Sequence, residues 1–141
     1  MKIIFLDFDG VINPISYHHS KGFSQAACSN LQSILTKEPS VRIVISSAWR
    51  RNGLETCQKI LKENGVDSTK VIGVTEAKGG WDPENREMQI DKWLKDHKEV
   101  KQFIVLDDFP MPKFGDKYLK INGYVGITQK DAEIALAVLC K

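Results

Sequence analysis

Hydrophobic and polar positions form two kinds of block along the chain: short unbroken apolar runs, and longer stretches with apolar residues on one helical face. The run IIFL at residues 3–6 is rich in β-branched residues and too short for a helix, so it predicts a strand that is buried on both faces of a sheet. The same reasoning predicts five strands, at residues 3–6, 41–45, 71–74, 103–106 and 118–121.

Between these runs, apolar residues recur every three or four positions, which is the spacing of an amphipathic helix. Proline, glycine and threonine supply the boundary signals: Pro39 follows the first helix, Gly65 stops the second, Pro83 opens the third and Thr128 is the expected N-cap of the last. The four predicted helices cover residues 23–36, 54–64, 84–97 and 131–139.

The alternation of strands and helices predicts an α/β fold, a three-layer Rossmann-like sandwich with a central parallel sheet of about five strands and helices on both faces. With 141 residues, of which 42% are hydrophobic, the chain fits a single domain over residues 1–141. The segment between Gly10 and Val41 is mostly needed for one helix, and the segment between Arg86 and Asp107 is equally short. We therefore expect no cap domain.

The charge pattern excludes some classes of protein. A net charge of +2 argues against a surface that coats a polyanion and against an acidic tail. The first apolar run stops at Asp7, too early for a signal peptide, and no segment approaches the roughly 20 apolar residues of a membrane helix. We expect a protein that is cytoplasmic where it is synthesised, without a signal peptide or membrane segment, with export by a specialised secretion system as the alternative.

Polar side chains follow three of the predicted strands at the point where each strand ends. Because the carboxyl ends of parallel strands share one edge of a sheet, where ligands bind in doubly wound folds, we expect these side chains to meet there. They are Asp7 and Asp9 after the first strand, Ser46 and Ser47 after the second, and Asp107 and Asp108 after the fourth.

Four carboxylates at one edge of a sheet repel each other, and a hard cation relieves that repulsion. Magnesium suits the site best because it takes oxygen ligands and keeps positions for water and phosphate. No His or Cys lies at these strand ends, which argues against zinc. The sequence therefore predicts Mg²⁺ as the cofactor.

The spacing of the first two carboxylates fits phosphoryl chemistry. Asp7 and Asp9 lie two positions apart, so they share a face of extended backbone, and Gly10 allows a sharp turn after them. One carboxylate can attack phosphorus to form an aspartyl-phosphate, while the other protonates the leaving oxygen and later activates water. The hydroxyl group of Ser46 can hold a phosphate oxygen.

Transfer of a phosphoryl group also needs a cation that balances its growing negative charge. Arg86, in the first turn of the third predicted helix, is the candidate, and Lys78 in the preceding loop is its competitor. Trp49 and Arg50 follow the second strand closely enough to contact the substrate as well.

Three stretches, DFDGV at Asp7, VRIVISS and FIVLDD, are similar in order and spacing to the first, second and fourth motifs of the haloacid dehalogenase-like (HAD) superfamily of phosphatases. The chain therefore resembles a capless HAD phosphatase. It departs from the family at the third motif, where a Lys is usual and Arg86 is the best-placed residue. The resemblance implies that Asp7 is the nucleophile and a Mg²⁺ ligand, that Asp9 is the general acid/base and binds the metal through its carbonyl, that Ser46 binds phosphate, that Asp107 binds Mg²⁺ and that Asp108 supports it.

By analogy with capless relatives, an open site favours a bulky, macromolecular substrate. We expect a phosphoprotein, with phosphotyrosine plausible because Trp49, Trp81 and Tyr17 could hold a ring. The chain is also loosely similar to small HAD-like effector domains of intracellular bacteria that have phosphotyrosine activity.

Two other functions compete with this hypothesis. Similar capless domains occur beside RNA-repair enzymes, so a polynucleotide or nucleotide phosphatase is the alternative; it is not favoured, because Arg42, Arg50 and Arg51 form only a small basic cluster. The other competing function is a Mg²⁺-binding interaction module without turnover. Retention of both Asp7 and Asp9 argues against it.

Overall fold

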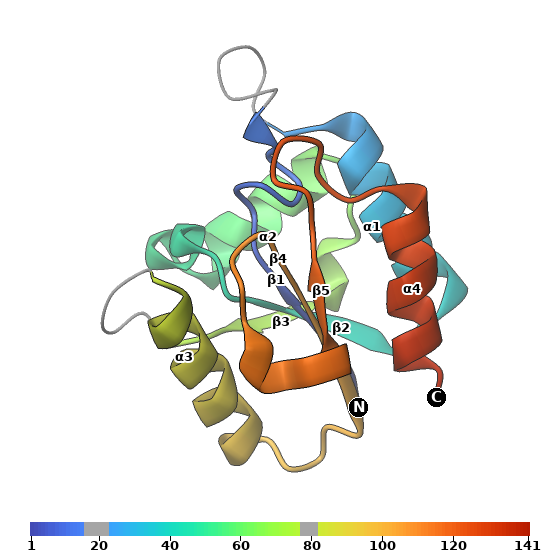
Figure 1. Ribbon diagram of the computed structural model, residues 1–141. Coiled ribbons are helices and arrows are strands. Elements are labelled where there is room, and N and C mark those ends of the chain that lie inside the picture. The colour runs from blue at the N-terminus through green and yellow to red at the C-terminus, as the bar shows by residue number, and fades with distance from the viewer. Residues whose placement is uncertain (16–22, 77–81) are drawn as a thin grey trace.

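A five-stranded parallel sheet in the order β3-β2-β1-β4-β5 runs through the middle of the molecule, as the computed structural model in Figure 1 shows. The structure describes residues 1–15, 23–76 and 82–141. The predicted α/β class, the parallel sheet and all five strands are confirmed. The strands are β1 (Lys2–Leu6), β2 (Val41–Ile45), β3 (Val71–Val74), β4 (Gln102–Asp107) and β5 (Tyr118–Lys120).

Helices cover both faces of this sheet and make the fold a three-layer sandwich. On one face lie α1 (Gln25–Lys37), α2 (Leu54–Glu63) and α4 (Gln129–Leu139), which pack on the larger part of the core. On the other face lie α3 (Pro83–Asp96) and the 3₁₀ segment η4 (Pro112–Lys117). Two further 3₁₀ segments, η2 (Ala48–Asn52) and η3 (Ser68–Lys70), follow β2 and precede β3.

The central strand β1 shows why the apolar runs are unbroken. Successive side chains of a strand point to opposite faces, so Ile4 and Leu6 enter the core under α1, α2 and α4, while Ile3 and Phe5 enter the core under α3. All four side chains are fully buried. A strand that is covered on both faces has no solvent-facing positions, and its sequence therefore shows no polar alternation.

The observed ends of the elements differ from the predicted ends by a few residues. The first helix begins at Gln25 with Ser24 as its N-cap, and β4 extends to Asp107. The Thr128 N-cap is confirmed: its hydroxyl accepts from the Asp131 amide, and the Asp131 carboxylate accepts from the Thr128 amide. This capping box starts α4 at Gln129, two residues before the predicted start.

Among the described residues, no separate cap domain stands over the carboxyl ends of the strands. Both termini lie at the opposite, amino end of the strands (Figure 1), where the Met1 amino group donates to the Glu99 carbonyl. Within residues 1–15, 23–76 and 82–141, no helix has the length and apolar character needed to cross a membrane.

The Thr128 cap gives a test of the fold. Replacing Thr128 with Ala removes the acceptor for the Asp131 amide and should lower the free energy of unfolding by about 1 kcal/mol, measured by urea denaturation. The control is Thr56→Ala at an exposed position within α2, where we expect a change below about 0.5 kcal/mol. Equal losses in the two variants would contradict the role of the cap.

Candidate active site

Three carboxylates converge where β1 and β4 end. The two strands pair in parallel, with Leu6 opposite Leu106, and the Asp7 amide donates to the Leu106 carbonyl at 3.1 Å. This register places Asp7 beside Asp107, and carboxylate oxygens of Asp7, Asp107 and Asp108 all lie within 4.8 Å of one another. Asp7 is 1% exposed and Asp107 is 0% exposed, so two of these acids are shielded from water.

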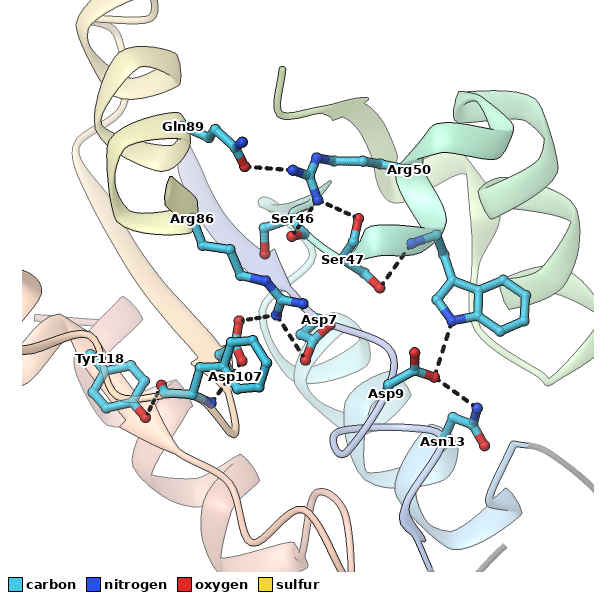
Figure 2. Close-up of polar contacts among 12 residues, drawn as sticks. Asp7, Asp9, Asn13, Ser46, Ser47, Arg50, Arg86, Gln89, Asp107 and Tyr118 are labelled. Carbon is cyan, nitrogen blue, oxygen red and sulfur yellow. Dashed lines mark hydrogen bonds and ion pairs between the residues drawn. The ribbon is translucent and has the colours of Figure 1, made fainter. Parts of the chain in front are cut away.

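Arg86 reaches this cluster from the first turn of α3 (Figure 2). Its Nη1 atom lies 3.2 Å from Oδ2 of Asp7 and donates to Oδ2 of Asp107 at 2.8 Å. Its guanidinium carbon lies 4.4 Å from the centre of the Phe109 ring, an arrangement that favours a cation. One arginine thus contacts two of the three carboxylates.

Burial and like charge set the electrostatics of the cluster. Burial raises the pKa of Asp7 well above its usual value and Asp107 raises it further, although Arg86 opposes both effects. Burial also raises the pKa of Asp107. For Arg86, burial lowers the pKa, but Asp7 and Asp107 outweigh it and the net shift is upward. One guanidinium does not neutralise three carboxylates.

The donor atoms of the cluster fit Mg²⁺. Oδ1 of Asp7 and Oδ1 of Asp108 are buried and have no hydrogen-bond partner among the described residues. Unpaired buried carboxylate oxygens are costly, and Mg²⁺ binds oxygen ligands from one or two carboxylates while keeping places for water and phosphate. Asp7, Asp107 and Asp108 are therefore the residues that would hold the ion.

Two glycines make room for the third acid. Gly10 has a φ of +83°, and a Cβ atom built there would lie 2.3 Å from Oδ2 of Asp108. A Cβ atom at Gly123 would lie 2.7 Å from the same oxygen. The Asp108 carboxylate therefore fits between two backbone segments that approach it closely only because both residues lack a side chain.

Asp9 is oriented by two donors on one oxygen (Figure 2). Its Oδ1 atom accepts from Nε1 of Trp49 at 3.0 Å and from Nδ2 of Asn13 at 2.9 Å. The Trp49 indole packs against Phe8 and Phe23, with ring centroids 6.0 and 5.5 Å away. Trp49 was expected to contact the substrate, but in the structure its N–H group is bonded to Asp9.

The two serines after β2 have different surroundings. The hydroxyl oxygen of Ser46 is buried without a hydrogen-bond partner in the described part of the chain, so it is free to contact a ligand. The Ser47 hydroxyl instead accepts from the Trp49 amide and caps η2. Of the two predicted phosphate-binding serines, Ser46 has the surroundings that the prediction requires.

Arg50, predicted as a substrate contact, is buried and bound to the protein itself. Its guanidinium donates to the carbonyl oxygens of Ser46 at 3.1 Å and Ser47 at 2.7 Å, and to Oε1 of Gln89 at 2.5 Å. Burial, with Arg86 close by, lowers its pKa to about 10. Arg50 therefore ties the loop after β2 to α3, the helix that carries Arg86.

The carboxylate of Asp7 lies below the surface of the site. Asp7 is 1% exposed. Two hollows flank it: one of 260 Å³, lined by Asp9, Ala48, Trp49 and Asn52, and one of 500 Å³ beside Asp108. Asp108 and Asp9, and not Asp7, are among the described residues that line these two hollows.

Sequence reasoning did not identify several residues of the site. Gln89 follows Arg86 by three positions, so helical spacing places it on the same face and could have indicated it. Asn13 and Gly123 gave no comparable signal, because their contacts depend on how loops fold back. Lys78, the competitor of Arg86, lies outside the described residues, as do Tyr17 and Trp81.

The metal assignment can be tested without measuring turnover. Adding millimolar Mg²⁺ to protein treated with EDTA should raise its Tm, because binding to the folded state alone stabilises it. Asp108→Asn should reduce this shift by at least half, whereas Asp116→Asn on exposed η4 should leave it unchanged. No Mg²⁺-dependent shift in the wild type, or an unchanged shift in Asp108→Asn, would contradict the assignment.

Comparison with known proteins gives the family. A family model described as "HAD domain in Swiss Army Knife RNA repair proteins" matches residues 3–132, which include all the candidate site residues. No curated protein and no solved structure matches the chain. The predicted HAD superfamily is confirmed, and with it Mg²⁺-dependent phosphohydrolase chemistry through an aspartyl-phosphate. The chain therefore belongs to the family of HAD domains in Swiss Army Knife RNA repair proteins.

Proposed function

We propose that this chain is a capless phosphomonoesterase that removes phosphate from the end of a polynucleotide, with Asp7 as the nucleophile. The observation that carries the proposal is the cluster of Asp7, Asp107 and Asp108, two of which bind Arg86, in a chain whose family is named for RNA repair proteins.

The first half of the reaction uses the carboxylate of Asp7. Arg86 holds Oδ2 of Asp7, and an oxygen of this carboxylate attacks phosphorus. As the P–O bond to the ester breaks, Asp9 gives its proton to the leaving oxygen. The Ser46 hydroxyl and Arg86 stabilise the transferred phosphoryl group, and bound Mg²⁺ supplies further positive charge against the carboxylates and phosphate.

The second half restores the enzyme. Asp9, now ionised, takes a proton from a water molecule, and this water attacks the phosphorus of the aspartyl-phosphate. The P–O bond to Asp7 breaks, phosphate leaves and Asp9 is protonated again. Both halves need Asp9 in one orientation, which the two hydrogen bonds to its Oδ1 favour.

The family bears on the choice between a phosphoprotein and a polynucleotide as the substrate. Sequence reasoning favoured a phosphoprotein, including phosphotyrosine held by aromatic rings. Of those rings, Trp49 is already packed and bonded to Asp9, and the other two lie outside the described residues. The family name supports the polynucleotide alternative, which we adopt, with the phosphoprotein as the competing outcome.

A substrate comparison with Mg²⁺ tests this function. We expect kcat/KM for end-phosphorylated oligoribonucleotides to exceed that for phosphotyrosine peptides by about tenfold or more. Asp7→Asn should lower turnover by about 10³-fold or more, because the nucleophile is lost, and Asp116→Asn should not. Preference for the peptides would favour the phosphoprotein; full activity of Asp7→Asn would refute the aspartyl-phosphate mechanism.

The hydrogen bond from Trp49 to Asp9 predicts a dependence on the leaving group. Trp49→Phe keeps a ring but removes the N–H group, so Asp9 should be less well oriented for proton transfer. We expect kcat to fall about tenfold for a ribose-hydroxyl leaving group and only about twofold for p-nitrophenyl phosphate, whose phenolate leaves with little need for a proton.

The matched control is Trp93→Phe on α3, whose indole packs against Phe5 on the other face of the sheet. It should change the rates with both substrates by the same factor. If Trp49→Phe also lowers both rates equally, its role is packing and not orientation of Asp9.

A further inference from the structure

The 500 Å³ hollow beside Asp108 is large enough for more than a phosphate group. Its walls are Ile15, Asp108 and the segment 120–124 that follows β5. The volume falls within the roughly 300–1,000 Å³ of sites for small organic molecules. Because an Asp108 carboxylate oxygen lies within 4.8 Å of one of Asp7, the hollow opens directly beside the carboxylate cluster.

Two hydrogen bonds hold the walls of this hollow in place, one between backbone groups and one from the backbone to a side chain. The Ile15 amide donates to the Gly123 carbonyl at 3.0 Å, which joins the loop after β1 to the loop after β5. Within the second loop, Oδ1 of Asn122 accepts from the Tyr124 amide at 3.0 Å. The wall is therefore formed before any ligand binds, and Gly123 also packs against Asp108.

The rim of the hollow combines an aromatic ring, apolar side chains and a cation. Tyr124 is 62% exposed, Ile15 is 51% exposed, and the neighbouring Val125 is 51% exposed. Lys120 is exposed at the end of β5. Exposed aromatic rings on which bases stack, beside cations that follow the backbone, are the means by which proteins bind single-stranded nucleic acid.

The smaller hollow beside Asp9 fits a nucleobase less well. Its volume is 260 Å³, and no cation is among the described residues that line it. Its aromatic residue, Trp49, already packs against Phe8 and Phe23 and donates to Asp9. Tyr124, by contrast, presents most of its side chain to solvent.

We propose that the hollow beside Asp108 binds the nucleoside next to the phosphate that is removed, with its base stacked on Tyr124 and with Lys120 against the neighbouring backbone phosphate. This inference rests on the proposed phosphatase function and adds the position and chemistry of substrate recognition. Stacking needs only a π-face, so the site accepts any base and selects for nucleic acid over other phosphate esters.

The stacking contact is tested by removing the Tyr124 side chain and the terminal base of the substrate, separately and together. The substrates are an end-phosphorylated oligoribonucleotide and the same oligonucleotide with an abasic terminal nucleotide, phosphorylated at the end that the wild type hydrolyses faster. The wild type should prefer the intact base by about tenfold in kcat/KM. Tyr124→Ala should abolish this preference, so that kcat/KM becomes about equal for the two substrates. Tyr124→Phe should keep the preference, because the ring and not the hydroxyl group carries the interaction.

Lys120 is tested by the dependence on salt. Each phosphate contact to a single strand contributes about 0.7 to the slope of log affinity against log salt concentration, so Lys120→Ala should lower the slope of log kcat/KM by about that amount. Lys62→Ala, at an exposed position in the last turn of α2, is the matched control and should keep the wild-type slope.

The outcomes separate this inference from the proposed function. If Tyr124→Ala keeps the tenfold preference for the base, or Lys120→Ala keeps the wild-type slope, the hollow does not bind the nucleoside, although turnover by the wild type still supports the phosphatase. If Tyr124→Ala lowers kcat/KM for a phosphotyrosine peptide more than for the oligonucleotide, the occupant is a protein side chain and the inference is wrong. A wild type without Mg²⁺-dependent turnover of any phosphate ester contradicts the proposed function itself.

Discussion

The repulsion among three carboxylates, opposed by one guanidinium, is the constraint around which the rest of the site is arranged. Two unit charges 4 Å apart interact by about 4 kcal/mol at an effective dielectric constant of about 20, a large part of the 5–15 kcal/mol that stabilises a typical domain. Arg86 contacts Asp7 and Asp107 and offsets part of this repulsion. The negative charge that remains suits a divalent cation, as do the buried oxygens of Asp7 and Asp108 that have no protein partner in the described part of the chain.

The position of Arg86 matters as much as its charge, and neighbouring side chains fix that position. Asp82 accepts from the Asn85 amide at the start of α3 and so sets where Arg86 enters the cluster. Arg50 links α3, through Gln89, to the carbonyl groups of the loop after β2. A buried arginine that is bonded to several oxygens of the protein orders two segments at once, so the phosphate-binding loop and the helix with the cation are held relative to each other.

Local sequence patterns predicted the elements of the fold, and particular residues show the physical reasons. Ile3, Ile4, Phe5 and Leu6 predicted a strand covered on both faces, and all four are fully buried. Thr128 predicted the start of α4 because an N-cap side chain bonds to an amide only three residues further along the chain, here that of Asp131. The carboxyl end of β4 lies one residue beyond the predicted end, because a strand continues as long as its neighbour offers partners, and Asp107 pairs with Lys120 of β5.

Within the site, the sequence alone determined which acids lie at the ends of β1 and β4, because parallel strands place their carboxyl ends at one edge. It also identified Arg86 as a candidate from its place in the first turn of a helix. Only the tertiary structure decided that Arg86 contacts Asp7 and Asp107, that Trp49 is bonded to Asp9, that Arg50 is bound to the protein, and that Gly123 packs against Asp108. Most of these contacts join residues that are far apart in the sequence, such as Arg50 and Gln89. They depend on side-chain direction and loop path, which leave no periodic pattern along the chain.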